Sequence, residues 1–199
     1  MKATALALLL ACGLLGTTQG AAHAAETDIA KQLITCTACH GAKGLSVNPL
    51  WPNLAGQNEE YLRTQLLAFR DGRRKDPLMS ATAKDLSDDQ IDALAAHYGK
   101  LSPPRAAEVH KNSVNKNAPH LEATSRPLVF CVRCHGGDGN SPNDIWPNLA
   151  GQKQTYMEKQ IKAYHAGDRK DDMMAMWGKM VDEKQMADIL GYFSRQGRK

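Results

Sequence analysis

The chain has 199 residues, a net charge of +4 at pH 7 and a hydrophobic fraction of 42%. This length fits one ordinary domain or two small ones. The positive charge is mild and interspersed, without a basic stripe, which argues against a nucleic-acid-binding protein.

Residues 1–24 have the pattern of a secretory signal peptide. Lys2 supplies a positive charge, an apolar run follows, and Ala22-His23-Ala24 forms a cleavage site of small residues. The run is too short for a membrane anchor, which needs about 20 apolar residues. Cys12 offers a weaker alternative, a lipoprotein cleavage site. We therefore predict a periplasmic protein, either free or associated with the membrane surface.

The rest of the chain contains a sequence repeat: its two halves align without a gap at an offset of 95 residues. Residues 51–57 are identical to residues 146–152. The repeat predicts a first domain at 25–100, a connector at 101–121 that contains several Pro, Lys and Asn residues, and a second domain at 122–199.

Each half is predicted to be a small helical unit without strands, so the fold class is all-α. In the first half, a helix capped by Thr27 or Asp28 runs into Cys36, and a second helix follows the cap residue Asn58 and ends at Gly72. These two helices carry apolar residues at helical spacing.

A third helix is predicted to begin at a capping box and to end at Gly99. The box is formed by Ser87 and Gln90, and Asp182 and Gln185 repeat it in the second half. Each box has a hydrophobic staple beside it, formed by Leu86 with Ile91 and by Val181 with Met186. Pro127 is expected to shorten the first helix of the second half.

The most informative motif is Cys-x-x-Cys-His, which occurs once in each half. It is the attachment signal of c-type haem: the cysteines form thioethers and the histidine binds the iron. A zinc site would place its cysteine pairs ~15–20 residues apart, and a thioredoxin-like redox site would need a βαβ unit. The motifs predict two covalently bound haem c groups, with thioethers at Cys36, Cys39, Cys131 and Cys134 and axial ligands at His40 and His135.

The sixth iron ligand is predicted to be methionine, which is the usual partner of histidine in electron-transfer cytochromes. Met79 is the candidate in the first half, and His97 is interpreted as structural because the second half has no histidine at the corresponding position. In the second half the repeat register selects Met174, with Met173 and Met176 as alternatives.

Residues near these ligands also have predicted roles. A ligating histidine usually donates its other N–H to a fixed acceptor, and the carbonyls of Pro52 and Pro147 are the candidates, unless these prolines only shape a turn. Tryptophan and basic side chains could line the haem edge and face the propionates, respectively: Trp51, Trp146, Arg74, Lys75, Arg169 and Lys170. The basic residues could equally be ordinary solvated surface.

With both haem motifs, the repeated Pro-Asn-Leu-Ala-Gly-Gln segments at 52–57 and 147–152 and the methionine spacing, the chain resembles cytochrome c4 over nearly all of its mature length. That family consists of periplasmic dihaem proteins built from two class I cytochrome c domains. The resemblance implies two tandem domains, each wrapped around a covalently bound haem and packed face to face. Propionates would lie near the interface, and electrons would pass between the haems.

Three functions are compared. The leading one is an electron carrier that donates to a membrane oxidase or reductase and accepts from an upstream dehydrogenase or cytochrome complex. The second is the electron-accepting cytochrome subunit of a periplasmic dehydrogenase. The third, a dihaem peroxidase, needs an open sixth iron position, whereas this chain offers a methionine in each half. We predict a carrier with redox-protein partners, not an enzyme.

Overall fold

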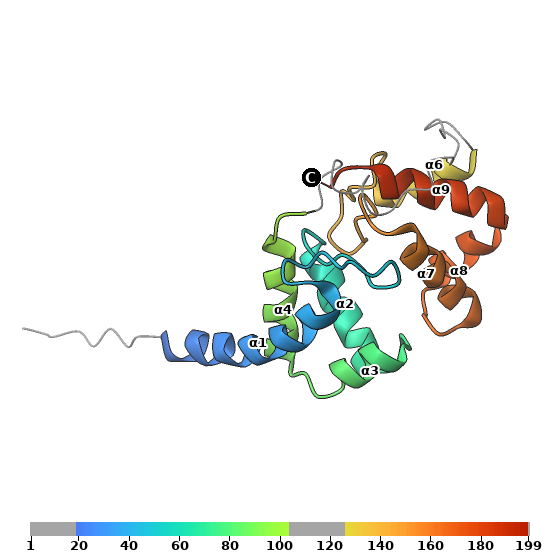
Figure 1. Ribbon diagram of the computed structural model, residues 1–199. Coiled ribbons are helices and arrows are strands. Elements are labelled where there is room, and N and C mark those ends of the chain that lie inside the picture. Colours follow the sequence, from blue (N-terminus) through green and yellow to red (C-terminus); the bar gives the residue numbers. More distant parts are fainter. Residues whose placement is uncertain (1–18, 104–125, 199) are drawn as a thin grey trace, which may run out of the picture.

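The computed structural model describes residues 19–103 and 126–198, and its helices form two groups, one from each half of the chain (Figure 1). The first group consists of α1 (Gln19–His40), α2 (Glu59–Arg70), α3 (Pro77–Ala83) and α4 (Asp88–Lys100). The second consists of α6 (Arg126–His135), α7 (Gln154–Ala166), α8 (Asp172–Lys179) and α9 (Glu183–Arg195). Within these described ranges there is no strand, which confirms the all-α prediction.

The first helix of each half differs in length. α1 has 22 residues and begins at Gln19, so the cap predicted at Thr27 or Asp28 is wrong for this chain. Four of residues 21–25 are alanine, the strongest helix former, and the predicted cleavage site therefore lies inside α1. In Figure 1 its N-terminal part projects away from the other helices. α6 has only 10 residues, with Pro127 second, as predicted.

Most of the predicted signal peptide and connector lies outside the described residues, at 1–18 and 104–125. Their boundaries stay predictions. None of the helices in the described ranges is both long and apolar enough to span a lipid bilayer.

Both predicted capping boxes are confirmed. The Ser87 hydroxyl accepts from the Gln90 N–H at the start of α4, and the Asp182 carboxylate accepts from the Gln185 N–H at the start of α9. The predicted end of α4 at Gly99 is wrong, because the helix continues through Lys100. A Cβ on Gly99 would lie 3.3 Å from a backbone oxygen of residue 57, so this glycine permits close packing.

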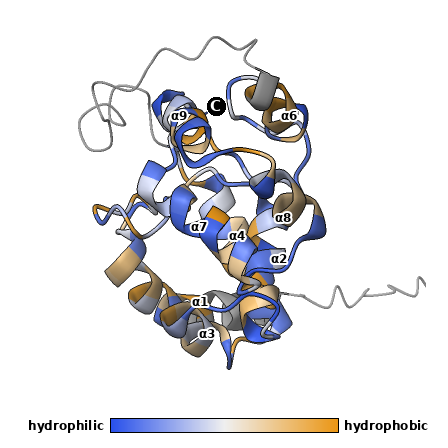
Figure 2. Cartoon of the chain, turned by 90° about the vertical axis from the view of Figure 1, so that its right-hand side faces the viewer, coloured by the Kyte–Doolittle hydropathy of each residue, from blue (hydrophilic) through white to orange (hydrophobic). Residues whose placement is uncertain are grey.

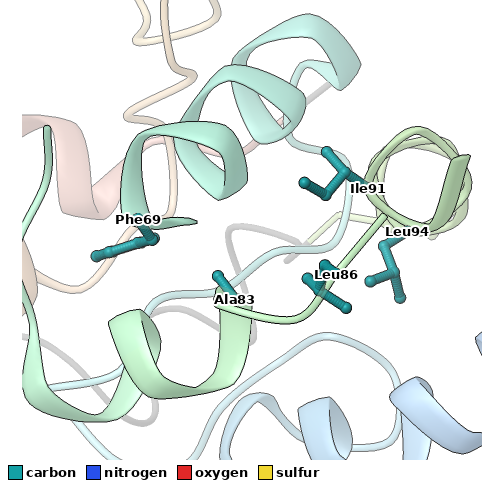
Figure 3. Packing of buried hydrophobic residues seen from close by; sticks show 5 residues of the cluster. All are labelled: Phe69, Ala83, Leu86, Ile91 and Leu94. Carbon is teal, nitrogen blue, oxygen red and sulfur yellow. The ribbon is translucent and has the colours of Figure 1, made fainter. Parts of the chain in front are cut away.

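Each half has a small apolar core. In the first half Leu86 and Ile91 pack together as the staple predicts, and both belong to a cluster formed by the ends of α2 and α3 and by α4 (Figure 3): Phe69, Ala83, Leu86, Ile91 and Leu94. The second cluster contains Leu128, Met157, Ile189, Leu190 and Phe193. Figure 2 shows hydrophilic and hydrophobic residues sharing the same helices, so each helix has an apolar side to bury. Each fully buried large side chain contributes ~1.5–3 kcal/mol.

Candidate haem-binding sites and the contact between the halves

The two haem motifs occupy the last turns of α1 and α6. Cysteines three residues apart share one helix face, and both pairs line a cavity. A glycine in the left-handed region ends the turn after each histidine, Gly41 with φ 80° and Gly136 with φ 79°. A Cβ on Gly41 would lie 2.3 Å from the Leu45 carbonyl oxygen, so only glycine fits there.

The chemistry of the cysteines argues against redox catalysis. The two cysteines of each pair are not joined by a disulfide. Burial raises the pKa of the Cys36 thiol, and it raises that of Cys131 to about 11. A catalytic or redox-active cysteine needs a lowered pKa, so these thiols are poor nucleophiles at neutral pH.

The histidines of the two motifs are held in the same way. The Nδ1 atoms of His40 and His135 lie 3.0 Å from the carbonyl oxygens of Pro52 and Pro147, respectively, which confirms the predicted acceptors. A carbonyl can only accept, so Nδ1 carries the proton and Nε2 offers its lone pair to a metal. Burial lowers the pKa of both imidazoles, and the Lys153 ammonium adds to this effect at His40. Both rings are therefore neutral and correctly oriented for an iron.

The methionines selected by the repeat register occupy equivalent positions. Met79 lies in α3 and Met174 in α8, and both line the cavity. Each is the third residue after an aspartate that caps its helix: the Asp76 carboxylate accepts from the Met79 N–H at 3.1 Å, and the Asp171 carboxylate accepts from the Met174 N–H at 2.9 Å. The same cap thus fixes both methionines relative to the chain.

The competing candidates are placed less well. Met173 lines the cavity but is 51% exposed, and Met176 is 50% exposed and does not line it. His97 does not line the cavity either, and its ring packs edge-on against Tyr98 with centroids 5.1 Å apart.

One continuous cavity of about 630 Å³ contains the motif residues of both halves. Its volume lies within the range of small-molecule and cofactor sites. Most of its lining is apolar, and Trp51 and Trp146 contribute to it, as the sequence predicted. A flat apolar group with two anionic side chains, such as haem, needs an apolar slot with cationic groups at one end.

Those cationic groups lie where the halves meet. Arg74 and Arg169 line the cavity, and each is only 6% exposed, so the alternative of solvated surface is wrong for both. The short backbone bridge between them joins the halves. The guanidiniums donate to tyrosine and glutamine oxygens of the other half: Arg74 to Tyr156 at 2.9 Å and Gln160 at 2.6 Å, Arg169 to Tyr61 at 2.7 Å and Gln65 at 2.8 Å.

These two arginines have no anionic partner among the residues that the structure describes. The ion pairs of the described residues involve neither of them. Burial opposes ionisation of the Tyr61 hydroxyl, but the Arg169 and Arg74 guanidiniums hold its pKa below the usual value. A buried cation without a counter-ion is costly, so haem propionates would supply the missing negative charge. The residues present therefore fit haem.

The repeated Asn-Leu-Ala-Gly-Gln segments explain how the halves are joined. The Gln57 amide accepts from the Asn148 N–H at 2.7 Å and donates to the Asn148 carbonyl at 2.9 Å. The Gln152 amide does the same to Asn53, with both distances 2.9 Å. We call these four hydrogen bonds between Gln57 and Asn148 and between Gln152 and Asn53 the lock. The lock was not predicted from the sequence, although the identity of the two segments was the signal for it.

Hydrogen bonds connect the lock to the two motif histidines. The Pro52–Asn53 peptide accepts from His40 on its carbonyl and donates its N–H to Gln152. A matching chain connects His135, through the Pro147–Asn148 peptide, to Gln57. Each proximal histidine is therefore hydrogen-bonded, through one peptide group, to a side chain of the other half.

Asn58 also contributes to this contact. It occupies the predicted N-cap position of α2, but its side chain makes no capping hydrogen bond, so the predicted capping interaction is wrong. Its amide instead donates to the Trp146 carbonyl at 2.7 Å and accepts from Asn148 at 2.9 Å.

Comparisons with known proteins identify the family. The Cytochrome c family model matches residues 20–102 and 128–195. A thiosulfate dehydrogenase electron acceptor from Thiomonas intermedia is 36% identical over 174 residues, covering 84% of this chain and 80% of the relative. Cytochrome c4 from Pseudomonas aeruginosa is 32% identical over 207 residues, covering 96% and 98%. The crystal structure of reduced recombinant cytochrome c4 from Pseudomonas stutzeri superposes with a TM-score of 0.67 at 26% identity, covering 86% of this chain and 98% of that one.

The chain belongs to the cytochrome c family. It is an electron-transfer cytochrome with two covalently bound haem c groups, and it acts as an electron carrier rather than as an enzyme.

Proposed function

We propose that this chain is a periplasmic carrier that passes single electrons between redox proteins, with one haem in each half. One observation carries the proposal: two Cys-x-x-Cys-His helices and two aspartate-capped, methionine-bearing helices line a single continuous cavity. Electron transfer needs no open coordination position, and this arrangement offers a histidine and a methionine to each iron.

The first haem is attached at Cys36 and Cys39 and the second at Cys131 and Cys134. The axial ligands are His40 with Met79 for the first iron and His135 with Met174 for the second. When bound, each haem supplies a one-electron redox centre, and methionine ligation raises its potential. The Pro52 and Pro147 carbonyls fix the proximal rings, so little reorganisation accompanies electron transfer.

The contact between the halves supports transfer from one haem to the other. The Gln57 and Gln152 locks are buried, at 4% and 3% exposure. Satisfied buried networks rigidify the structure around them. The halves are therefore held at a fixed separation while the charge of either iron changes.

Two roles in electron transfer are compatible with this arrangement. The first is a membrane oxidase or reductase at a late step of a respiratory chain, which the raised potential of histidine–methionine ligation favours. The second is service as the electron acceptor of a periplasmic dehydrogenase. The relative from Thiomonas intermedia, named as a thiosulfate dehydrogenase electron acceptor, favours this role.

The proposal is tested first on the purified protein. Mass spectrometry after denaturation should show two haem additions per mature chain, and the spectrum of the reduced protein should not change with carbon monoxide. A bare polypeptide mass, or carbon monoxide binding at both haems in the wild type, would contradict the ligand set.

Assays with each partner distinguish these two roles. The oxidised protein is mixed with a thiosulfate dehydrogenase and thiosulfate, and the reduced protein is mixed with membranes containing a terminal oxidase. Rapid turnover in one assay selects that role, and the rate should fall with salt because encounter is electrostatic. Peroxidase turnover by the isolated chain, proportional to its haem content, would contradict the carrier assignment.

A further inference from the structure

Four cationic side chains are buried in the part of the chain that the structure describes: Arg74, Lys153, Arg169 and Arg198, each 5–6% exposed. No aspartate or glutamate is buried in the same ranges. Inside a protein, where the effective dielectric constant is about 20, a charge acts over longer distances than at the surface. The position of each of these cations relative to the two haem sites therefore matters.

Two of the four are arranged symmetrically, because Arg74 and Arg169 occupy the same position in the repeat. Arg198 donates to the Ala55 carbonyl at 2.8 Å and to the Ala150 carbonyl at 3.1 Å, and these two alanines are themselves equivalent in the repeat. It therefore lies between the halves, and a third, longer bond joins it to the Asn148 carbonyl of the second half at 3.3 Å.

Lys153 breaks the symmetry. Its ammonium donates to the side-chain oxygen of Asn53, the residue that follows the Pro52 carbonyl acceptor of His40. The equivalent position in the other half holds Asn58, a neutral amide that accepts from Asn148 at 2.9 Å. The proximal network of His40 therefore meets the Lys153 ammonium directly. The network of His135 ends on a neutral amide and meets a cation only through the longer Arg198 contact at the Asn148 carbonyl, 3.3 Å.

The charge of Lys153 is not cancelled by its surroundings. Lys153 does not line the cavity, so a propionate held there does not pair with it. It joins no ion pair in the described residues. Burial, and after it the Arg198 guanidinium, lowers the pKa of Lys153 to about 8, so the amine is still mostly protonated at pH 7.

A cation near a redox centre stabilises its reduced form, which carries one positive charge fewer. We propose that the charge of Lys153 raises the redox potential of the first haem more than that of the second. Lys153 is a positioning residue in this role, because it acts through Asn53 and the peptide that holds His40. This inference rests on the proposed function, since it needs a redox centre in each half.

The test compares Lys153→Gln, which keeps an N–H donor but removes the charge, with Lys153→Arg, which keeps the charge. Holoprotein is titrated at pH 7 and followed by NMR of the haem methyl signals. They are assigned to each half by the shifts that Leu94→Val in the first half and Ile189→Val in the second produce, since both residues line the cavity. Lys162→Gln, at an exposed position of the helix that Lys153 precedes, is the matched control.

Lys153→Gln should shift the distribution of one electron about tenfold away from the first haem, equivalent to 59 mV for a one-electron couple. Lys153→Arg and Lys162→Gln should leave the distribution within twofold of the wild type. An unchanged distribution in Lys153→Gln, or equal shifts of both haems, would overturn the inference. A titration that shows fewer than two redox centres in the wild type would instead overturn the proposed function.

If Lys153→Gln does not fold, the wild type answers the same question. Raising the pH from 7 to 9 removes most of the lysine charge, and the first haem should then lose potential relative to the second. The charged or titratable groups that interact with Lys153 are Arg198 and His40. Arg198, with a pKa lowered to about 10 by burial, keeps most of its charge at pH 9. A distribution that does not move between pH 7 and 9 would overturn the inference.

Discussion

Replacing the two equivalent glutamines of the lock should lower the unfolding free energy by unequal amounts. Gln152→Met keeps the volume of the side chain but removes every polar atom. The N–H and the carbonyl of Asn53 and the N–H of Lys153 then lose their hydrogen-bond partner, and Asn53 is only 7% exposed. Each unsatisfied buried group costs ~1–3 kcal/mol, so we expect a loss of about 3 kcal/mol in unfolding free energy.

Gln57→Met should cost about two thirds as much, although Gln57 makes the same pair of bonds to Asn148. The Asn148 carbonyl also accepts from the Arg198 guanidinium at 3.3 Å, so it keeps a partner, and only the N–H groups of Asn148 and Asn58 lose theirs. The difference between the two variants comes entirely from Arg198, which has no equivalent beside Asn53.

The assay is urea denaturation of the holoprotein, followed by far-UV circular dichroism and Soret absorbance. Gln90→Met is the control, because Gln90 contributes a capping box within one half and its loss should cost about 1 kcal/mol or less. A Gln57→Met variant that is destabilised as much as Gln152→Met, or more, would refute the reasoning about Arg198.

Three further predictions concern single residues. Met174→Ala should convert one haem to a form that binds carbon monoxide, whereas Met176→Ala should leave the visible spectrum unchanged; the reverse result would reject the repeat register. Asp182→Ala removes a confirmed cap and should lower the unfolding free energy by ~1 kcal/mol in chemical denaturation. Lys153 has a pKa of about 8 when folded and 10.5 as the reference value, so the unfolded chain binds more protons between these values. Its contribution to stability should therefore rise from pH 8 to 10.5, and the rise should be missing in Lys153→Gln.

Features set by neighbouring residues could be predicted from the sequence. The capping boxes depend on side chains three positions apart, and the Pro52 and Pro147 acceptors depend on a fixed offset from each histidine that the repeat shows twice. The cavity-lining position of Met174 followed from the same register. In each case one short segment contains the whole interaction.

Features set by contact between the halves could not be predicted. Asn58 has the sequence context of a helix cap, and only the presence of Trp146 and Asn148 beside it diverts its amide. For Arg74 and Arg169 the sequence left two alternatives, facing propionates or lying on the solvated surface, because their partners in the other half lie more than 80 positions away. The identical segments 51–57 and 146–152 carried the information, but a repeat alone does not tell which residues of one copy contact the other.

The contact between the halves has a consequence for how such a chain can change. Its main elements are self-complementary, since Gln57 does to Asn148 what Gln152 does to Asn53. Two separate copies of a single module could form the same isologous contact as a homodimer, but every residue would then occur on both sides. Covalent tandem linkage removes that restriction. An asparagine at position 58 and a lysine at position 153 can coexist only because one gene encodes both copies, and duplication is what allows two chemically identical cofactors to acquire different electron affinities.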